Sequence, residues 1–599
     1  MKITNKFGEY FRFYYRLTGK RLIVTLMLSV AVSVLDGIGL AMFMPLLQAT
    51  GSDNGVKSKE ALGSLHFITD FIQAIGFRLN IYTVLFFLVI LFITKGIMKF
   101  MQLNYQVNTR HFFMKKVRYM LINDLESISY KGFLQLDAGR IHNTLTVEVS
   151  RLMQSMNNYF NAAQNVVMLS SYIVLAFIAN FEFAIFVVVG AGLSNLIYRK
   201  IYQICRKISL QLSQQGNSFN SLLVQAVHNY KYLKSTNYLH RFSQKIKNVI
   251  DKTEYLNKRI GFYNAITNSV KEPIMIIIIV GVIIIKLYVL GGTITSIMLS
   301  LLLFYRSINF LMQVQNEWQG FIQASGGITT VTTMLSEMEA QKEVQPEKMF
   351  KQFNQQIHIR EVTFSYGATK ILNKIDLLIP KNETIALVGE SGSGKTTLAN
   401  IISGLLQPTT GHVMLDNVSL KDLNLNSYRS RIGYISQEPV IFNDDVFNNI
   451  TFWAEPTKEN IEKFWKIVEL ASLTTFINQL ADNEKTILGD NGMLISGGQK
   501  QRISIARELY KEVDILILDE ATSALDSETE KVIQYNIEKL HGSYTIIIIA
   551  HRLSTIKNAD IIYLLEKGNV LEYGSFDTML NTSNRFKRMV ALQEMQSPV

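Results

Sequence analysis

The sequence contains almost no cysteine: Cys205 stands alone among 599 residues. One thiol cannot form a disulfide within the chain, which excludes a secreted scaffold held together by disulfides. The N-terminal sequence also lacks the pattern of a cleaved signal peptide. Residues 1–21 are basic and aromatic, but the apolar run after them is too long for a signal peptide, and no small-residue cleavage site follows it. We therefore expect a retained membrane segment.

Acidic residues are fewer than basic ones, with 48 Asp and Glu against 60 Lys and Arg, so the formal net charge is +12. A basic balance can indicate a nucleic-acid partner, but no recognition motif accompanies these residues, and we expect no such partner. The mean hydropathy is nevertheless positive, +0.16. This mixture predicts a membrane part joined to a water-soluble part, with basic loops kept in the cytoplasm. The length predicts two or more domains.

Apolar stretches can cross about 30 Å of hydrocarbon when they contain roughly 20 helical residues. Six such stretches are present, at residues 22–47, 81–101, 159–179, 181–201, 262–287 and 294–313. Lys and Arg gather before the first stretch and in the two long loops at residues 102–158 and 202–260, whereas the links on the other side have few or none. The positive-inside bias therefore predicts that both termini and both long loops are cytoplasmic.

Two features of these stretches leave alternatives open. Residues 61–77 predict an amphipathic helix on the outer side, which either rests at the membrane interface, covers a lateral opening or packs within the outer loop. Charged side chains are unusual inside a span, and Arg306 lies near the middle of the sixth. Arg306 either forms a structural ion pair, with Asp36 as one candidate partner, or binds an anionic headgroup of a substrate.

A glycine-rich turn follows the apolar residues 385–388 and precedes an expected helix. Its fixed positions match the phosphate-binding loop pattern, in which glycines let successive backbone N–H groups point into one concavity at a helix N-terminus. Lys395 is expected to reach the β- and γ-phosphates of ATP, and the Thr396 hydroxyl to bind Mg²⁺. The expected phosphate-binding residues are Gly389, Glu390, Ser391, Gly392, Ser393, Gly394, Lys395, Thr396 and Thr397.

A second signal is the segment VDILILDE, which ends in Asp519 and Glu520. The apolar run before Asp519 predicts a strand buried on both faces of a parallel sheet, with the acids at its carboxyl end, where ligands bind. Asp519 is expected to hold Mg²⁺ through water. Glu520 is expected to polarise the water that attacks the γ-phosphate.

Between these two signals lies LISGGQKQR, in which a serine and two glycines open a helix and form a second anion site. This segment resembles the signature motif of the ATP-binding cassette (ABC) transporters, with Ile495 where leucine is usual. The resemblance implies that the signature of one subunit closes on the γ-phosphate held by the other subunit, so that the protein is a dimer. The signature residues are Ser496, Gly497, Gly498 and Gln499.

Other positions resemble motifs of the same family. Tyr366 is similar to the aromatic residue that stacks on adenine, and Gln437 is similar to the glutamine that touches Mg²⁺ and the attacking water. His551 resembles the switch histidine that contacts the γ-phosphate. Ser523 and Asp526 resemble a contact between the two subunits.

The resemblance covers the whole chain and implies the layout of an exporter half-transporter. We expect an all-α transmembrane domain of six helices with long cytoplasmic extensions at residues 1–325, a linker at 326–355 and an α/β P-loop NTPase domain at 356–599. Because every expected hydrolytic residue occurs in one chain, a homodimer with two competent ATP sites is favoured. A cassette ATPase acting on DNA or ribosomes should lack the membrane spans, and an ATP-gated channel or receptor should lack a hydrolytic residue.

The resemblance implies ATP-driven export or flipping of an amphipathic substrate by alternating access. The first span and the outer helix are loosely similar to features of bacterial lipid-linked oligosaccharide flippases. We therefore expect an integral protein of a bacterial inner membrane, and rank a lipid-linked oligosaccharide or other lipid above peptides and hydrophobic drugs as the substrate.

Overall fold

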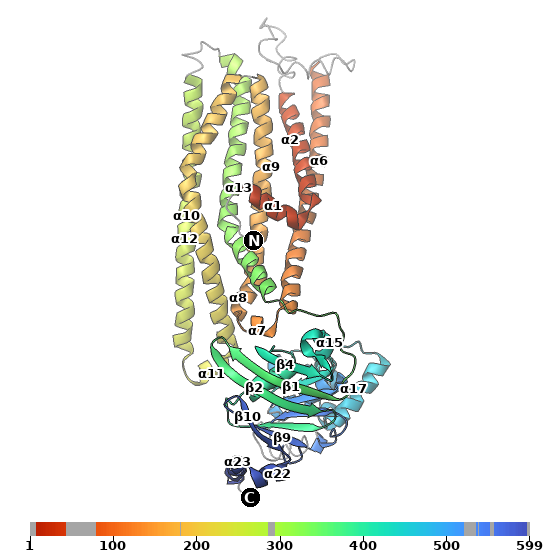
Figure 1. Cartoon of the computed structure of the whole chain (residues 1–599). Coiled ribbons are helices and arrows are strands. Elements are labelled where there is room, and N and C mark those ends of the chain that lie inside the picture. Colours follow the sequence, from red (N-terminus) through yellow and green to blue (C-terminus); the bar gives the residue numbers. More distant parts are fainter. Residues whose placement is uncertain are drawn as a thin grey trace. The chain divides into compact units, whose positions relative to one another are not determined.

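The computed structural model describes residues 7–42, 80–179, 181–284, 294–519, 535–536, 538–550 and 556–595. The chain divides into two compact units (Figure 1). Unit 1 is helical and comprises Met1–Ile128 and Gly132–Lys342. Unit 2 combines sheets and helices and comprises Ser129–Lys131 and Glu343–Val599.

Six long helices lie in the described part of unit 1, and they coincide with the six apolar stretches of the sequence. They are α2 (Lys20–Ala41), α6 (Ile81–Ser127), α9 (Val149–Ala179), α10 (Phe181–His228), α12 (Leu239–Ile284) and α13 (Ile294–Ala340). With 48 residues, α10 is about 70 Å long, more than twice the thickness of the hydrocarbon core. The expected extension of the helices beyond the membrane is therefore present.

Short elements precede the first long helix or connect the later ones, as the sequence predicts for the polar loops. They are α1 (Phe7–Thr18), α7 (Tyr130–Phe133), α8 (Ala138–Asn143), the π-helix η1 (Thr144–Glu148) and α11 (Tyr230–Ser235). Residues 326–340, expected as part of a linker, instead form the last turns of α13. They stay helical because Ile328, Val331, Met334 and Met338 form a buried apolar stripe along the helix. The predicted outer helix at residues 61–77 lies outside the described residues.

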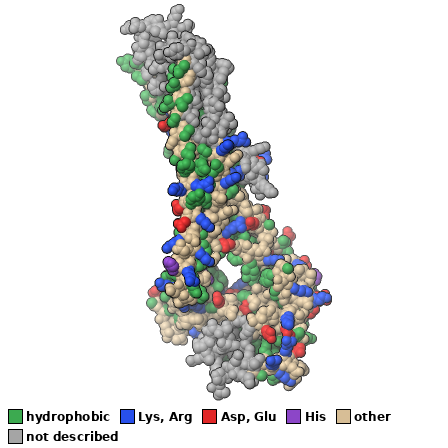
Figure 2. Space-filling view, turned by 90° about the vertical axis from the view of Figure 1, so that its left-hand side faces the viewer, with side chains coloured by type: hydrophobic (Ala, Val, Ile, Leu, Met, Phe, Trp, Pro, Cys, Tyr) green, Lys and Arg blue, Asp and Glu red, His purple; other side chains and the backbone are tan. Residues whose placement is uncertain are grey.

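The surface of unit 1 changes character along its helices. Within the described part, Lys20–Gly39 in α2 and a window of α6 are long and apolar enough to cross a membrane. Figure 2 shows hydrophobic side chains on the upper part of the described helices and Lys and Arg side chains further down. On α12 the exposed apolar residues near the C-terminal end are Val270, Ile276, Ile277, Val280 and Ile284. This distribution fits lipid around one end of the helices and water around the other.

The core of unit 1 described here is rich in aromatic residues. Tyr14 from α1 is fully buried, and its ring lies 5.3 Å from that of Tyr159 in α9. Its hydroxyl group hydrogen-bonds to Ser155 over 2.8 Å. The basic residues of α1, Arg12 and Arg16, alternate with its buried aromatic residues, so that the N-terminal segment packs against α2 and α6 by its apolar face.

The described residues of unit 2 form two sheets. A four-stranded antiparallel sheet has the order β2-β1-β4-β5, formed by β1 (Gln356–Tyr366), β2 (Thr369–Pro380), β4 (Thr410–Leu415) and β5 (Val418–Ser419). A six-stranded sheet has the order β10-β9-β3-β8-β7-β6. Its strands are β3 (Thr384–Val388), β6 (Ile432–Ile435), β7 (Ile515–Asp519), β8 (Thr545–Ile549), β9 (Ile561–Glu566) and β10 (Asn569–Gly574).

All strands of the six-stranded sheet are parallel except β10, which pairs antiparallel with β9. Every residue of β3, β7 and β8 is buried. This full burial explains their continuous apolar sequences, because a parallel sheet is covered on both faces.

Helices of unit 2 surround this sheet. They are α14 (Lys395–Ile402), α15 (Leu425–Arg429), α16 (Val446–Thr451), α17 (Lys458–Leu470), α18 (Thr474–Asn478), α19 (Gly497–Tyr510), α22 (Phe576–Thr582) and α23 (Asn584–Met595). The described part of unit 2 also has short 3₁₀ turns at η3 (Leu420–Asp422), η4 (Asn483–Lys485) and η5 (Asp490–Gly492).

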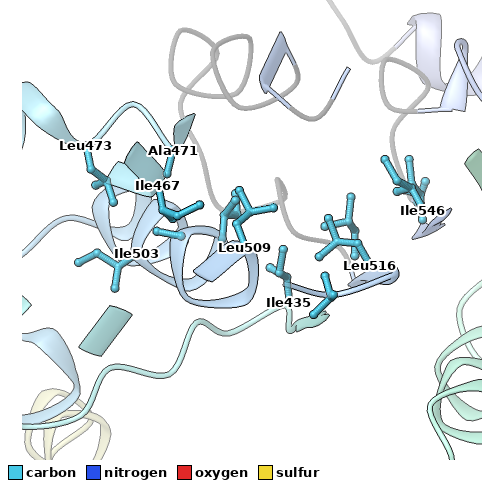
Figure 3. Packing of buried hydrophobic residues seen from close by; sticks show 14 of the residues in the cluster. Ile435, Ile467, Ala471, Leu473, Ile503, Leu509, Leu516 and Ile546 are labelled. Atoms are coloured by element: carbon cyan, nitrogen blue, oxygen red, sulfur yellow. The ribbon is translucent and has the colours of Figure 1, made fainter. Parts of the chain in front are cut away.

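The two faces of the sheet belong to two separate cores. In β7, Leu516 and Leu518 pack with α16, α17 and α19, whereas Ile515 and Ile517 pack with α14 and the antiparallel sheet. Alternation along β3 and β8 follows the same rule, because successive side chains of a strand point to opposite faces. Figure 3 shows the first core running from Ile467 and Ile503 on the helices to Ile546 on the sheet.

Candidate functional site

Three of the sequence-predicted segments come together at one edge of the six-stranded sheet. The glycine-rich loop follows β3, Gln437 follows β6, and Asp519 is the last residue of β7. The strands β3, β8, β7 and β6 are consecutive neighbours and run parallel, so their carboxyl ends lie at the same edge. This edge is where ligands bind in open parallel sheets.

The glycine-rich loop adopts a conformation that requires glycine. Gly389 and Gly394 have φ angles of 151° and 104°. A Cβ on Gly389 would lie 2.1 Å from the carbonyl oxygen of Leu565, and one on Gly394 would lie 2.6 Å from Leu372 Cδ2. Gly392, with φ at 81°, faces open space instead. The loop therefore folds tightly against β2 and β9 and leaves its outer side clear, at the N-terminus of α14.

The loop also supplies positive charge and hydrogen-bond donors. Lys395 is 5 % exposed, and its Nζ donates to the carbonyl oxygens of Gly389 and Glu390 over 2.9 and 3.0 Å. Among the described residues, no group hydrogen-bonds to Ser393 Oγ, although this atom is buried. The hydroxyl group of Thr396, by contrast, is on an exposed residue. These groups fit the phosphates of a nucleotide, which would satisfy the Ser393 hydroxyl and the N–H groups of the first helical turn.

Asp519 is held in place by a tyrosine that the sequence analysis did not single out. The Tyr434 hydroxyl group, on the neighbouring strand β6, donates to Asp519 Oδ2 over 2.9 Å. Burial raises the pKa of Tyr434, and the adjacent Asp519 carboxylate raises it further. The phenol therefore stays protonated and remains a donor. The signal in the sequence was the spacing of Tyr434 three residues before Gln437, on a strand that pairs with β7.

Magnesium is compatible with this edge, although no group of three or more His, Cys, Asp or Glu side chains suited to a metal occurs among the described residues. Mg²⁺ in nucleotide sites commonly takes one or two protein oxygens together with phosphate oxygens and water. Asp519 is 9 % exposed, and Oδ1 is its carboxylate oxygen that Tyr434 does not occupy. Gln437 is exposed two residues after β6.

Tyr366 ends β1 with its ring accessible. It is 39 % exposed, and its ring lies edge-on to that of Phe364 with centroids 4.8 Å apart. Tyr366 pairs with Thr369 in the β1–β2 hairpin, and Leu372 of the same hairpin lies against Gly394 of the loop. An exposed ring on this hairpin can stack on a base.

The signature segment has an open helix N-terminus. Ser496 caps α19 by accepting from the backbone N–H of Gln499 over 3.3 Å, and Gln499 Oε1 accepts from the backbone N–H of Ser496 over 2.8 Å. Ser496 and Gly497 are exposed. The structure does not bring this segment and the glycine-rich loop to one face, because α19 and α14 pack on opposite faces of the sheet.

Several expected site residues cannot be placed. Glu520, Ser523, Asp526 and His551 lie outside the described residues.

In unit 1, Asp36 has partners other than the expected one. It forms an ion pair with Lys95 of α6, and its Oδ2 accepts from the Tyr172 hydroxyl group over 2.8 Å. Arg306 is exposed and is not the ion-pair partner of Asp36. Lys95 is not among the predicted site residues, although it is a charge inside the second apolar stretch that the sequence allows to pair with the charge in the first.

Unit 1 also contains an apolar cavity of about 510 Å³ between α2 and α9. The hydroxyl groups in its wall are satisfied internally: Ser170 donates to Val166 O over 2.8 Å, and Ser33 donates to Ser171 Oγ over 2.8 Å. The wall is therefore chemically apolar despite its serines. The lining residues are Ser33, Val34, Gly37, Ile38, Val166, Val167, Ser170, Ser171 and Val174.

Comparison with known proteins agrees with this geometry. Residues 372–523 match the family model described as ABC transporter. The chain is 30 % identical over 500 residues to the ATP-dependent lipid A-core flippase of Shewanella denitrificans, covering 79 % of this chain and 81 % of the relative. It is 29 % identical to the heterocyst differentiation ATP-binding protein HepA of a Nostoc species, covering 79 % of this chain and 78 % of the relative.

Among solved structures, a bacterial Atm1-family ABC exporter with ATP bound has the same fold, with a TM-score of 0.79 and 20 % identity. The match covers 97 % of this chain and 99 % of the exporter. Both units and their order are therefore those of an exporter half-transporter. The chain belongs to the ABC transporter family, as an exporter half-transporter that couples ATP hydrolysis to transport across a membrane.

Proposed function

We propose that two copies of this chain form a homodimer in a bacterial inner membrane, with both termini in the cytoplasm, and that the dimer flips an amphipathic lipid at the expense of ATP. The orientation rests on the clusters of Lys and Arg in the long loops. The substrate class rests on relatives named ATP-dependent lipid A-core flippase in several bacteria. A lipid-linked oligosaccharide or another glycolipid with an anionic head fits this class.

The observation that carries the dimer is the separation of the two anion sites in one chain. The glycine-rich loop and the signature each end in an open helix N-terminus, and the two helices pack on opposite faces of the sheet. The triphosphate of one ATP needs the glycine-rich loop of one subunit and the signature of the other subunit. In the dimer, Ser496, Gly497, Gly498 and Gln499 of one subunit cover the γ-phosphate held by Lys395 of the other. The Ser496 hydroxyl accepts from Gln499 and still has its own proton to donate.

The hydrolytic step uses groups at the carboxyl edge of the sheet. Thr396, Gln437 and, through water, Asp519 would hold Mg²⁺, which would supply positive charge beside the β- and γ-phosphates. Glu520 polarises the attacking water, and His551 contacts the γ-phosphate. Tyr434 keeps one oxygen of Asp519 occupied, so that the carboxylate presents its other oxygen in a fixed direction. Tyr366 stacks on the adenine, and Ser523 and Asp526 contact the partner subunit.

The membrane part offers two features for an amphipathic substrate. Arg306 is exposed, whereas the charge of Asp36 is already matched by Lys95. An exposed cation inside a membrane span favours an anionic headgroup. The cavity between α2 and α9 has a wall without free donors, which suits alkyl chains.

Glu520→Gln tests the mechanism in purified dimers reconstituted into liposomes. We expect ATP binding to persist while ATP turnover and lipid flipping both collapse, because Gln cannot polarise the attacking water. Glu462→Gln, the same acid-to-amide exchange at an exposed position of α17, serves as the charge control and should leave both activities intact. Retained flipping in Glu520→Gln would remove Glu520 from this role.

The substrate is tested by stimulation of ATP turnover in the same liposomes by anionic glycolipids, neutral lipids, peptides and cationic drugs. We expect anionic glycolipids to stimulate most, and Arg306→Ala to lose this stimulation while Arg306→Lys retains it. Stimulation by neutral or cationic compounds alone would contradict a lipid substrate with an anionic head.

A further inference from the structure

A buried arginine connects the signature helix to the segment that follows Gln437. Arg507, in the third turn of α19, is 5 % exposed. Its Nη1 donates to the carbonyl oxygen of Val440 over 2.7 Å, and its Nε donates to the carbonyl oxygen of Asn449 over 2.6 Å. Val440 lies three residues after Gln437, and α19 begins at the signature. The Arg507 side chain therefore links the helix that begins at the signature to the segment that follows Gln437.

Asn449 of α16 completes this connection. Its Oδ1 accepts from Arg507 Nη2 over 3.1 Å and from the backbone N–H of Phe442 over 2.8 Å. Its Nδ2 donates to the carbonyl oxygens of Phe442 and Asp445 over 3.0 and 2.9 Å. Asn449 is 1 % exposed. Two buried side chains thus bind backbone groups of Val440, Phe442 and Asp445, in addition to the bridge between Asp445 and Ile487.

The charge of Arg507 is held by neutral partners. Its guanidinium lies 5.3 Å from the centre of the Phe442 ring and 5.1 Å from that of the Phe452 ring. Its hydrogen-bond acceptors within the described residues are carbonyl and amide oxygens, and Glu508 acts on its charge electrostatically. Burial of a cation without a bound carboxylate is unfavourable, and burial accordingly lowers the pKa of Arg507. A leucine or methionine would fill the same space without this penalty.

We propose that Arg507 is a positioning residue for ATP hydrolysis, which locks the segment after Gln437 to the signature helix so that the two act as one rigid body. The inference rests on the proposed roles of Gln437 and the signature. The planar guanidinium is required because it reaches three acceptors in fixed directions and lies over two neighbouring rings. A lysine ammonium keeps the charge but cannot hold both carbonyl groups and both rings.

The test compares Arg507→Lys, Gln437→Ala and the double variant as full-length dimers in liposomes, measuring kcat and KM for ATP, nucleotide affinity and the thermal midpoint. Arg502→Lys is the matched control, because Arg502 lies on the same helix and donates to the carbonyl oxygen of Ser472, away from the Gln437 segment. We expect Arg507→Lys to lower kcat by between about tenfold and the roughly hundredfold that a 1 Å misplacement can cost, with KM and nucleotide affinity unchanged. The double variant should be no slower than the slower single variant, because both act through the placement of Gln437.

Other outcomes decide against the inference. If Arg507→Lys turns over ATP as fast as Arg502→Lys, or if the losses of the single variants multiply, Arg507 does not act through Gln437. If Gln437→Ala itself turns over ATP normally, the proposed role of Gln437 fails, and the inference fails with it. Where Arg507→Lys yields no folded dimer, Phe442→Leu removes one ring at the surface and should lower kcat roughly two- to fivefold at unchanged KM. A normal kcat in Phe442→Leu would then overturn the inference.

Discussion

Replacing Arg151 should loosen the packing of three helices in unit 1. Arg151 Nη1 donates to Glu148 Oε1 over 3.1 Å and to Ser213 Oγ over 2.6 Å. Its Nη2 donates to Ser209 Oγ over 3.0 Å and to the carbonyl oxygen of Gln323 over 3.1 Å. This side chain therefore joins η1 and α9 to α10 and α13. In Arg151→Met these bonds are lost while most of the side-chain volume is kept.

The size of the loss of stability depends on Glu148, the acid that stays buried after the substitution. Glu148 is 1 % exposed, and after the substitution its donor in this cluster is the Ser213 hydroxyl group, 3.0 Å from Oε2. Breaking a buried ion pair by removing one partner costs about 3–5 kcal/mol, because a charge is left uncompensated. Arg151 is partly exposed, so the lower value applies. At about 2 °C per kcal/mol for a large unit, the unfolding midpoint should fall by roughly 6 °C.

The only cysteine of the sequence provides the assay. Cys205 lies in unit 1 and is fully buried in the same core, so a dye that becomes fluorescent on reacting with a thiol reports unfolding of unit 1 alone. The double variant Glu148→Gln, Arg151→Met also removes the uncompensated charge of Glu148. It should therefore recover at least half of the decrease in the unfolding midpoint. A single variant that melts within 2 °C of the parent would refute the argument, as would a double variant that melts below the single one.

Two further predictions concern titratable groups. In the native dimer at pH 8, Cys205 should resist maleimide, because burial raises its pKa to about 11 and leaves only about 0.1 % of the side chain as the reactive thiolate. Denatured protein should label fully. Rapid labelling of the native protein would contradict the burial of Cys205. Burial also raises the pKa of Glu508 above its ordinary value of 4.5, so its contribution to stability is complete at low pH and is lost as the pH rises through the folded-state pKa. Glu508→Gln should therefore raise the unfolding midpoint at pH 8 and lose this advantage towards pH 4, and an equal gain at both pH values in calorimetric scans would show that charge is not the cause.

The sequence by itself determined the layout of the protein. Six apolar stretches became six long helices because length and hydropathy are properties of a single segment. The glycine-rich loop and the Asp519 strand were also predictable, since each rests on a local constraint: a backbone conformation that excludes side chains, and burial on both faces of a sheet. The C-terminal end of α13 was not predictable in this way, because polar residues interrupt the apolar stripe of residues 328–338, and the helix turns those polar residues outward.

Only the tertiary structure decided which distant side chains meet. Asp36 binds Lys95 and Tyr172 rather than Arg306, because an ion pair depends on which helices are neighbours and at what height. Tyr434 reaches Asp519 only because β6 and β7 are adjacent and in register. Arg507 reads in the sequence as one of several basic residues on a helix, yet packing places it against Val440 and Asn449. Such contacts are set by the way the elements pack together, and no periodicity in a single segment encodes them.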